Sequence, residues 1–221
     1  MTERLQRLSK GDYTMETSKI TLAGMIYGLS FSHKTMGEDF FKANICVYRK
    51  SENYDELRLI VPSIIAEKIE NEKEYLIYGS IRTRNAQTEG NRKLEVYVFV
   101  NEILDYPGYD INEVELRGYI CKQPTFRKTP FGRQITDFLM AVNRPTGKSD
   151  YIPCIAWGRS AERMESLEIG TEIKIKGRIQ SRIYNKRISE TDFEERTAYE
   201  VSTYSFEILE ECNGSKLEED R

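Results

Sequence analysis

An internal repeat constrains the fold of this chain more than any other feature of its sequence. When the second half is slid back by about 94–98 residues, 20–26 (ITLAGMI) aligns with 114–120 (VELRGYI). Further matches keep the same order, namely Gly37 with Gly132, 43–49 with 138–144, 66–67 with 161–162, 78–81 with 176–179 and 95–104 with 200–209. Self-similarity of this kind indicates copies of one structural unit, so the 221 residues are expected to form two domains rather than one large fold.

The repeat divides the chain into segments with different expected roles. The two copies span residues 20–104 and 112–209, and the turn-rich segment 105–111 joins them. Residues 1–19 are expected to form an N-terminal extension and residues 210–221 an acidic tail.

The second copy is predicted to contain five strands and one short helix. Its expected strands are 114–120, 135–143, 151–157, 172–184 and 199–209. Gly118 is expected to mark a bend or bulge, Ser160 to cap a helix that ends at Gly170, and Ile183 to face inward. Five strands with a helix between the third and the fourth is the order of an OB-fold, a small partly open barrel. The expected class is therefore all-β with one short helix per domain, built as two tandem OB-fold barrels.

One face of the second copy combines aromatic rings with cations. Its members on the third and fourth strands are Tyr151, Trp157, Lys174, Lys176, Arg178, Arg182 and Tyr184. A strand aromatic by itself more often belongs to a core, and a cationic strand face is usually only solvated. Here rings and cations lie on the same side of two alternating strands. This combination favours single-stranded nucleic acid as the ligand, because every base offers a π-face and every nucleotide a phosphate. The same fold also binds oligosaccharides and proteins, so the pattern alone leaves those ligands open.

Seven short motifs follow one another through the second copy. They are 112–120 (NEVELRGYI), 124–127 (PTFR), 131–132 (FG), 139–144 (LMAVNR), 150–158 (DYIPCIAWG), 161–162 (AE) and 176–182 (KGRIQSR). In this order they resemble the bacterial single-stranded DNA-binding protein (SSB) family over residues 112–209. The resemblance implies an OB-fold that binds single-stranded DNA without sequence preference and protects it in replication, recombination and repair.

The resemblance also implies a set of DNA-binding residues. Base stacking would fall on Tyr151, Trp157 and Tyr184, the three rings that already share one side of their strands in the alternating pattern. Cationic contacts would fall around Arg127, Arg178 and Arg182, with Phe131 as a further contact at the tip of the first hairpin.

The first copy lacks the aromatic residues of this face. The positions aligned with Tyr151, Trp157 and Tyr184 carry Glu56, Pro62 and Ala86. We therefore expect the first domain to bind DNA weakly or not at all, and to serve packing, oligomer assembly or partner docking. An exposed face with Leu76 and Tyr78 would suit an interface.

The net charge of −3 hides an uneven distribution. Residues 1–116 hold 15 Lys+Arg against 19 Asp+Glu, residues 117–188 hold 15 against 6, and residues 189–221 hold 3 against 11. A basic segment between two acidic ones is compatible with phosphate binding. The net charge of the whole chain, taken alone, argues weakly against such binding.

Metal, cofactor and enzymatic chemistry are not expected. The cysteines Cys46, Cys121, Cys154 and Cys212 lie far apart, and His33 is the single histidine, so the spacing of a metal site is missing. A metal-dependent nuclease would need clustered carboxylates. The only dense group is Glu190, Asp192, Glu194 and Glu195, which is predicted to be a solvated hairpin tip.

The expected partners follow from the resemblance. They are single-stranded DNA and a second copy of the chain, since a homodimer would supply four OB-folds, together with replication or repair proteins. No segment is apolar enough for a membrane span or a signal peptide, so a cytoplasmic, nucleoid-associated bacterial protein is expected. The alternative that stays open is an OB-fold adaptor, like primosomal or recombination accessory proteins, that acts mainly through protein contacts.

Overall fold

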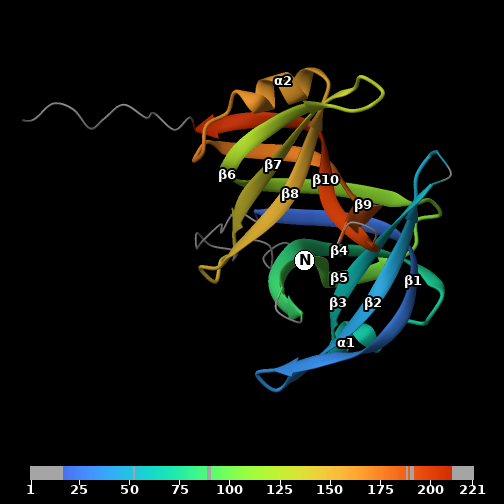
Figure 1. The fold of residues 1–221 in the computed structure, drawn as a ribbon. Coiled ribbons are helices and arrows are strands. Elements are labelled where there is room, and N and C mark those ends of the chain that lie inside the picture. Colours follow the sequence, from blue (N-terminus) through green and yellow to red (C-terminus); the bar gives the residue numbers. More distant parts are fainter. Residues whose placement is uncertain (1–16, 52, 89–90, 188, 190–191, 211–221) are drawn as a thin grey trace, which may run out of the picture.

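The chain folds into two five-stranded β-barrels that lie against each other (Figure 1). The computed structural model describes residues 17–51, 53–88, 91–187, 189 and 192–210. The first barrel comprises β1 (Ser18–Thr35), β2 (Glu38–Tyr48), β3 (Tyr54–Pro62), α1 (Ser63–Ala66), β4 (Lys73–Thr88) and β5 (Asn91–Asp105). The second comprises β6 (Ile111–Lys128), β7 (Gln134–Asn143), β8 (Ser149–Trp157), α2 (Arg159–Glu165), β9 (Glu172–Arg187) and β10 (Phe193–Glu210). The predicted order of five strands with a helix between the third and the fourth is confirmed.

Each barrel closes because its first strand pairs with two neighbours. β1 pairs with β2 and β4, and β6 pairs in the same way with β7 and β9. Parallel pairing of β3 with β5, and of β8 with β10, completes each ring. Alternate side chains fill the interiors, among them Leu22, Ile45, Leu59, Ile77 and Val98 in the first barrel and Leu116, Met140, Ile152, Ile175 and Val201 in the second.

Glycine is required where two strands of a barrel approach closely. A Cβ atom added at Gly118 would lie 2.3 Å from the carbonyl oxygen of Ala141. Comparable contacts of 2.2–2.3 Å with backbone oxygens arise at Gly24, Gly79 and Gly177. A bulge is absent at Gly118, because the register shifts of β6 lie further along, between Ile120 and Thr125. Next to Gly118, at Tyr119, β6 changes its partner from β9 to β7.

Gly118→Ala is expected to lower the free energy of unfolding by about 1–3 kcal/mol, because the added methyl group overpacks against backbone that cannot move aside. Urea denaturation followed by circular dichroism measures the change. Thr125→Ala is the matched control, since Thr125 is an exposed residue of the same strand. Equal stability of the two variants would contradict the close approach.

The two barrels are joined by a strand ladder. Ser18–Ala23 of β1 pairs antiparallel with Ile111–Leu116 of β6, so the sheets of both barrels run on into each other through adjacent strands. Figure 1 shows these two strands side by side between the barrels. The ladder fixes the position of the first barrel relative to the second.

A buried carboxylate strengthens this seam. Asp150 of β8 is 0% exposed and accepts a hydrogen bond from the backbone N–H of Thr83 on β4 (2.6 Å). Arg144 donates to the same carboxylate through Nε (2.7 Å), and Arg82 of the first barrel lies 3.3 Å from it. The Thr83 hydroxyl also accepts the N–H of Tyr151 (3.0 Å). The first barrel therefore holds the backbone of the strand that carries Tyr151.

The repeat reproduces this arrangement on the other side of the seam. Asp55 of β3, also 0% exposed, accepts the N–H of Ser181 on β9 (2.9 Å) and Nε of Arg49 (2.7 Å). The Ser181 hydroxyl accepts the N–H of Glu56 (3.1 Å). The barrels are thus related by an approximate two-fold axis, although they belong to one chain.

Two local predictions are wrong. Ser160 does not cap α2, because the helix begins one residue earlier, after Gly158, with no side-chain cap. The residue before the helix is Gly158, whose φ of +55° lies in the left-handed region that favours glycine over a residue with a capping side chain. Ile183 does not face a core and is 65% exposed, because this part of β9 extends beyond the barrel as a hairpin with β10.

The last match of the repeat is displaced by two residues. Gly79 pairs with Val100 across β4 and β5, and its repeat mate Gly177 pairs with Thr203 across β9 and β10. Val100 is therefore equivalent to Thr203, and the sequence match of 95–104 with 200–209 is wrong. A register shift lies beside each glycine pair, and an inserted residue of this kind is invisible in hydrophobic alternation.

Candidate nucleic-acid interface

Two aromatic rings stand on β8 of the second barrel. Tyr151 is 47% exposed and Trp157 is 36% exposed, so both offer ring surface to solvent. They are six residues apart on one strand, which corresponds to about 20 Å at a typical strand rise. Their spacing suits two separate bases. Ile155 lies between them on the same side by parity but is buried at 3% exposure.

Trp157 is held in place by a hydrogen bond. Its indole Nε1 donates to the hydroxyl of Ser202 on β10 at 3.0 Å. Ser202 lies opposite Ile155 in the parallel pairing of β8 and β10, so the bond ties the ring to the neighbouring strand. A ring fixed before binding loses little conformational entropy when a base stacks on it.

The third ring lies on the long β9–β10 hairpin. Tyr184 pairs with Arg196 in the register of that hairpin, and the guanidinium of Arg182 lies 5.6 Å from the Tyr184 ring centroid. This distance is within the range of a cation–π contact. Arg182 itself is exposed, so the hairpin presents a ring and a cation together.

The β6–β7 hairpin contributes Arg127 and Phe131. Phe131, at the turn, is 92% exposed. Arg127 donates to both carboxylate oxygens of Asp137 across the hairpin, at 2.5 and 3.2 Å. This hydrogen bonding raises the pKa of Arg127, which stays charged, but its charge is compensated locally. A bound phosphate would have to share Arg127 with Asp137.

The cations at the start of β9 are also paired. Lys174 lies 2.9 Å and Lys176 lies 3.7 Å from the carboxylate of Glu115 on β6. The hydrogen bond from Lys174 lowers the pKa of Glu115 below its ordinary value. The pair is therefore fully formed above the usual glutamate range and is lost only as the pH falls through the lowered pKa. Arg178 lies further along, with Nη2 at 3.5 Å from Gln180.

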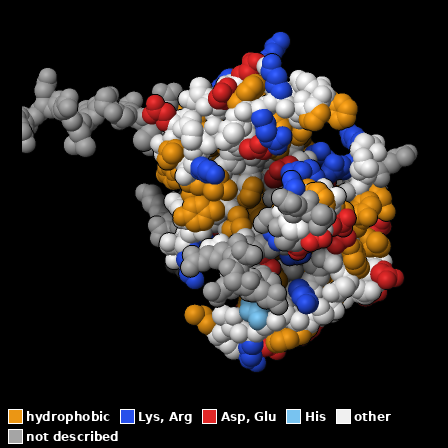
Figure 2. Space-filling view, in the orientation of Figure 1, with side chains coloured by type: hydrophobic (Ala, Val, Ile, Leu, Met, Phe, Trp, Pro, Cys, Tyr) orange, Lys and Arg blue, Asp and Glu red, His pale blue; other side chains and the backbone are white. Residues whose placement is uncertain are grey.

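Sequence parity did not reveal the acidic partners of this face. Glu200 of β10 accepts a hydrogen bond from Gln180 of β9 (2.8 Å), and Gln180 is buried although its parity places it with the cations. Asp137 and Glu115 come from other strands. On the side of the molecule that Figure 2 shows, Lys and Arg side chains are likewise interspersed with Asp and Glu.

Other candidate chemistries find no support in the described residues. Within the ranges given above, no group of three or more His, Cys, Asp or Glu side chains could hold a metal ion. His33 stacks on Phe40, with ring centroids 5.2 Å apart, and contacts the Ser32 hydroxyl. Glu190, Cys212, residues 1–16 of the predicted extension 1–19 and residues 211–221 of the predicted tail 210–221 lie outside the described residues, whereas Ser18 and Lys19 belong to β1 and Glu210 to β10. Among the helices that are described, none has the length and hydropathy of a membrane span.

Comparisons with known proteins agree with the geometry of the second barrel. The model of the single-strand binding protein family matches residues 111–209. The chain is 35% identical over 111 residues to single-stranded DNA-binding protein A of Bacillus subtilis, covering 47% of this chain and 62% of that protein. It is 31% identical over 112 residues to single-stranded DNA-binding protein 2 of Listeria monocytogenes, covering 48% and 68%. The matched part of the chain covers about three fifths of the length of relatives such as the Bacillus subtilis protein.

A solved structure resembles both barrels. Wild-type single-stranded DNA binding protein from Thermus aquaticus superimposes with a TM-score of 0.66, covering 86% of this chain and 92% of that chain at 21% identity. At this identity the likeness is one of fold, and it confirms the predicted class of two tandem OB-fold barrels. Since the match to the Listeria relative extends over more than two thirds of that protein, the chain belongs to the single-strand binding protein family.

Proposed function

We propose that this protein binds single-stranded DNA without sequence preference and protects it during replication, recombination and repair. The observation that carries the proposal is the set of solvent-facing rings on β8 and the β9–β10 hairpin, within the barrel that the family model matches. Tyr151, Trp157 and Tyr184 supply stacking surfaces that any base can use. The family is one of binding proteins, and the chain is proposed to act by binding and not by catalysis.

The cations of the second barrel complete the proposed site. Arg182 and Phe131 are exposed at the two hairpins, and Arg127 lies close to the turn of the first. Lys174, Lys176 and Arg178 are proposed to follow phosphates as well, with a smaller contribution from the two lysines because Glu115 compensates their charge.

The single tryptophan provides a direct test. Titrating the full chain with oligo-dT should quench Trp157 fluorescence as a base stacks on the indole. Unchanged emission together with unchanged mobility of a labelled oligonucleotide would overturn the proposal. Weak quenching with tight binding to a replication protein would favour the adaptor alternative.

Arg182→Ala is expected to reduce the salt dependence of DNA binding. Loss of one phosphate contact lowers the slope of log K against log salt by about 0.7 for a single strand. Labelled oligo-dT, titrated by fluorescence anisotropy at several salt concentrations, gives the slope. Lys68→Ala provides the control, because Lys68 is exposed beyond α1 of the first barrel, and an equal change in both variants would exclude a specific contact.

A homodimer with four OB-folds is proposed as the assembled form. Tyr78 of β4 is 40% exposed and Leu104 of β5 is 44% exposed, and Leu104 pairs with the half-buried Leu76. These side chains make an apolar area on a sheet face, which supports association. Cytoplasmic, nucleoid-associated action and recruitment of replication or repair proteins belong to the same proposal.

Tyr78→Glu is expected to shift the protein from dimer to monomer, because a charge would be buried at the contact. Size-exclusion chromatography with light scattering measures the mass. Tyr109→Glu, at an exposed ring of the segment between the barrels, should leave the mass of the wild-type assembly unchanged. A wild-type protein that is monomeric, or a Tyr78→Glu protein that stays dimeric, would reject this interface.

A further inference from the structure

The outer face of the first barrel differs from that of the second in charge as well as in aromatic content. The strand registers give the equivalent positions of the two barrels. Three positions of the first barrel differ from their equivalents in the second: Lys42 from Asp137, Arg58 from Pro153, and Tyr97 from Glu200. At each position the first barrel carries the residue better suited to a nucleotide. The loss of the three stacking positions is therefore only part of its divergence.

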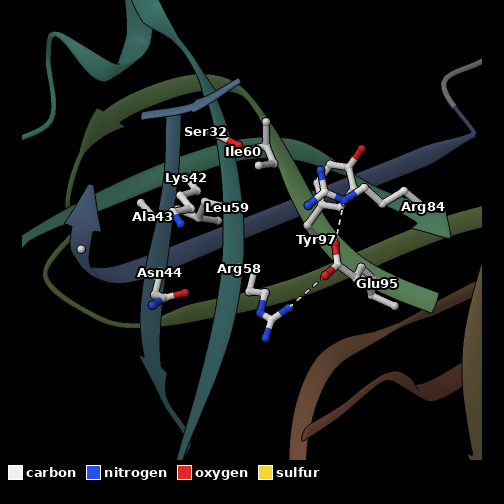
Figure 3. Close-up of a pocket in the computed structure, with 12 residues that line it drawn as sticks. Ser32, Lys42, Ala43, Asn44, Arg58, Leu59, Ile60, Arg84, Glu95 and Tyr97 are labelled. Atoms are coloured by element: carbon white, nitrogen blue, oxygen red, sulfur yellow. Dashed lines mark hydrogen bonds and ion pairs between the residues drawn. The ribbon is translucent and has the colours of Figure 1, made fainter. Parts of the chain in front are cut away.

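These residues surround a hollow of about 390 Å³ on the first barrel. Lys42 and Asn44 of β2 lie on one side of it, and Arg84, Glu95 and Tyr97 lie on the other (Figure 3). Arg58 of β3 lies between the two sides. The size of the hollow falls in the range of small-ligand sites, and its polar side chains come from all five strands of the barrel.

Glu95 holds two guanidinium groups at the hollow. Its carboxylate lies 2.6 Å from Nε of Arg84 and 3.9 Å from Nη1 of Arg58. Arg84 also lies 5.9 Å from the ring centroid of Tyr97. Each guanidinium has five N–H groups and the arginine side chains are about half exposed, so both keep donors for a ligand. With Lys42, three cations face one carboxylate, which favours an anionic ligand.

The position of the hollow indicates which anion it receives. Arg84 follows Thr83, whose hydroxyl accepts the N–H of Tyr151, the first ring of the second barrel's site. On the other side, Arg58 lies 5.7 Å from the ring centroid of Tyr199 on β10. Two walls of the hollow therefore adjoin the second barrel, since β4 is bonded to the backbone of Tyr151 and Arg58 of β3 contacts Tyr199.

We propose that this hollow binds one nucleotide of the same single strand that occupies the second barrel. The phosphate lies among Lys42, Arg58 and Arg84, and the base stacks on Tyr97. The inference rests on the proposed function, and it reverses the expectation that the first barrel binds DNA weakly or not at all.

The test uses the full chain with the double variant Lys42→Ala/Arg84→Ala, whose side chains are exposed. Two labelled oligo-dT probes are titrated, one of about 8 nucleotides, which one OB-fold can hold, and one of about 30, which can cross both barrels. The long probe should bind about tenfold more weakly than to wild type, with a salt slope smaller by about 1.4, because two phosphate contacts are lost. The short probe should keep its affinity and its quenching of Trp157.

The outcomes separate the two proposals. If neither probe quenches Trp157 in the wild-type protein, the proposed function fails. If both probes quench it, and the double variant binds the long probe as wild type does, the first-barrel site is rejected. Lys50→Ala/Lys68→Ala removes two exposed cations of the same barrel away from the hollow, and an equal loss in that variant would also reject the site.

Three further measurements separate loss of the site from loss of folding and a strand from a free nucleotide. Thermal unfolding should give the same midpoint for the double variant and wild type, and Lys42→Glu alone should weaken the long probe by charge reversal. Thymidine monophosphate distinguishes a free nucleotide from a nucleotide within a strand. If thymidine monophosphate binds the hollow tightly and the long probe does not compete with it, the strand-binding inference is overturned.

Discussion

Asp150→Ala should lower the free energy of unfolding by about 3–5 kcal/mol, the cost of removing one partner from a buried ion pair. The carboxylate is fully buried and serves Arg144, Arg82 and the backbone N–H of Thr83 at once. Its loss removes the carboxylate acceptor of two guanidinium groups and of one N–H group at the seam between the barrels, and Arg144 keeps only its bond to the Thr83 carbonyl oxygen. Urea denaturation followed by circular dichroism gives the difference.

Asp137→Ala is the matched control for this experiment. Asp137 also pairs with an arginine of the second barrel, but its side chain is 40% exposed, so its loss should cost no more than about 1 kcal/mol. Asp55→Ala should also be strongly destabilising, because Asp55 is buried and binds an arginine of its own barrel and a backbone N–H across the seam, as Asp150 does. Similar stabilities for Asp150→Ala and Asp137→Ala would show that the seam is not held by the buried carboxylate.

Trp157→Ala should weaken binding of oligo-dT by about 5- to 150-fold, which corresponds to about 1–3 kcal/mol for one stacked base. The salt slope should stay close to that of wild type, since no charge is removed. Because the variant lacks tryptophan, fluorescence anisotropy of a labelled oligonucleotide is the appropriate measurement.

Two variants bracket the effect at Trp157. Trp157→Phe keeps a stacking surface while it removes the hydrogen bond to Ser202, so it should retain most of the affinity. Tyr109→Ala removes an exposed ring between the barrels and should bind as wild type does. An affinity of Trp157→Ala equal to that of Tyr109→Ala would mean that the indole is not a stacking surface.

The barrel architecture could be predicted from the sequence because alternation and repetition both report on buried side chains. Ile173, Ile175 and Ile179 recur at every second position and all face the interior. The signal fails where a strand leaves the barrel, and Ile183 continues the same alternation into solvent. Periodicity describes a strand's two sides, but it does not say whether a core lies beside either of them.

The candidate site could be predicted only in part, for a related reason. Parity places Lys174 and Lys176 on one side of β9, but it does not show that Glu115 lies opposite them on β6. Such pairs depend on the register between strands distant in sequence, and a register shift displaced the match at β5 and β10 by two residues. The hollow around Tyr97 was missed because that displacement concealed the difference between Tyr97 and Glu200.

The approximate two-fold axis at the seam bears on the direction of a bound strand. A nucleic acid strand has chemically distinct 5′ and 3′ ends, whereas two identical subunits related by a true axis present the same surface to either end. Here the equivalent positions hold different residues, as with Trp157 and Pro62, and the ladder of β1 and β6 keeps the unlike faces in one fixed relation. On the proposed sites, a strand that crosses both barrels meets two unlike faces. The two directions of crossing, first barrel to second and second to first, are therefore distinct for a strand of given polarity, whereas between identical subunits they are equivalent.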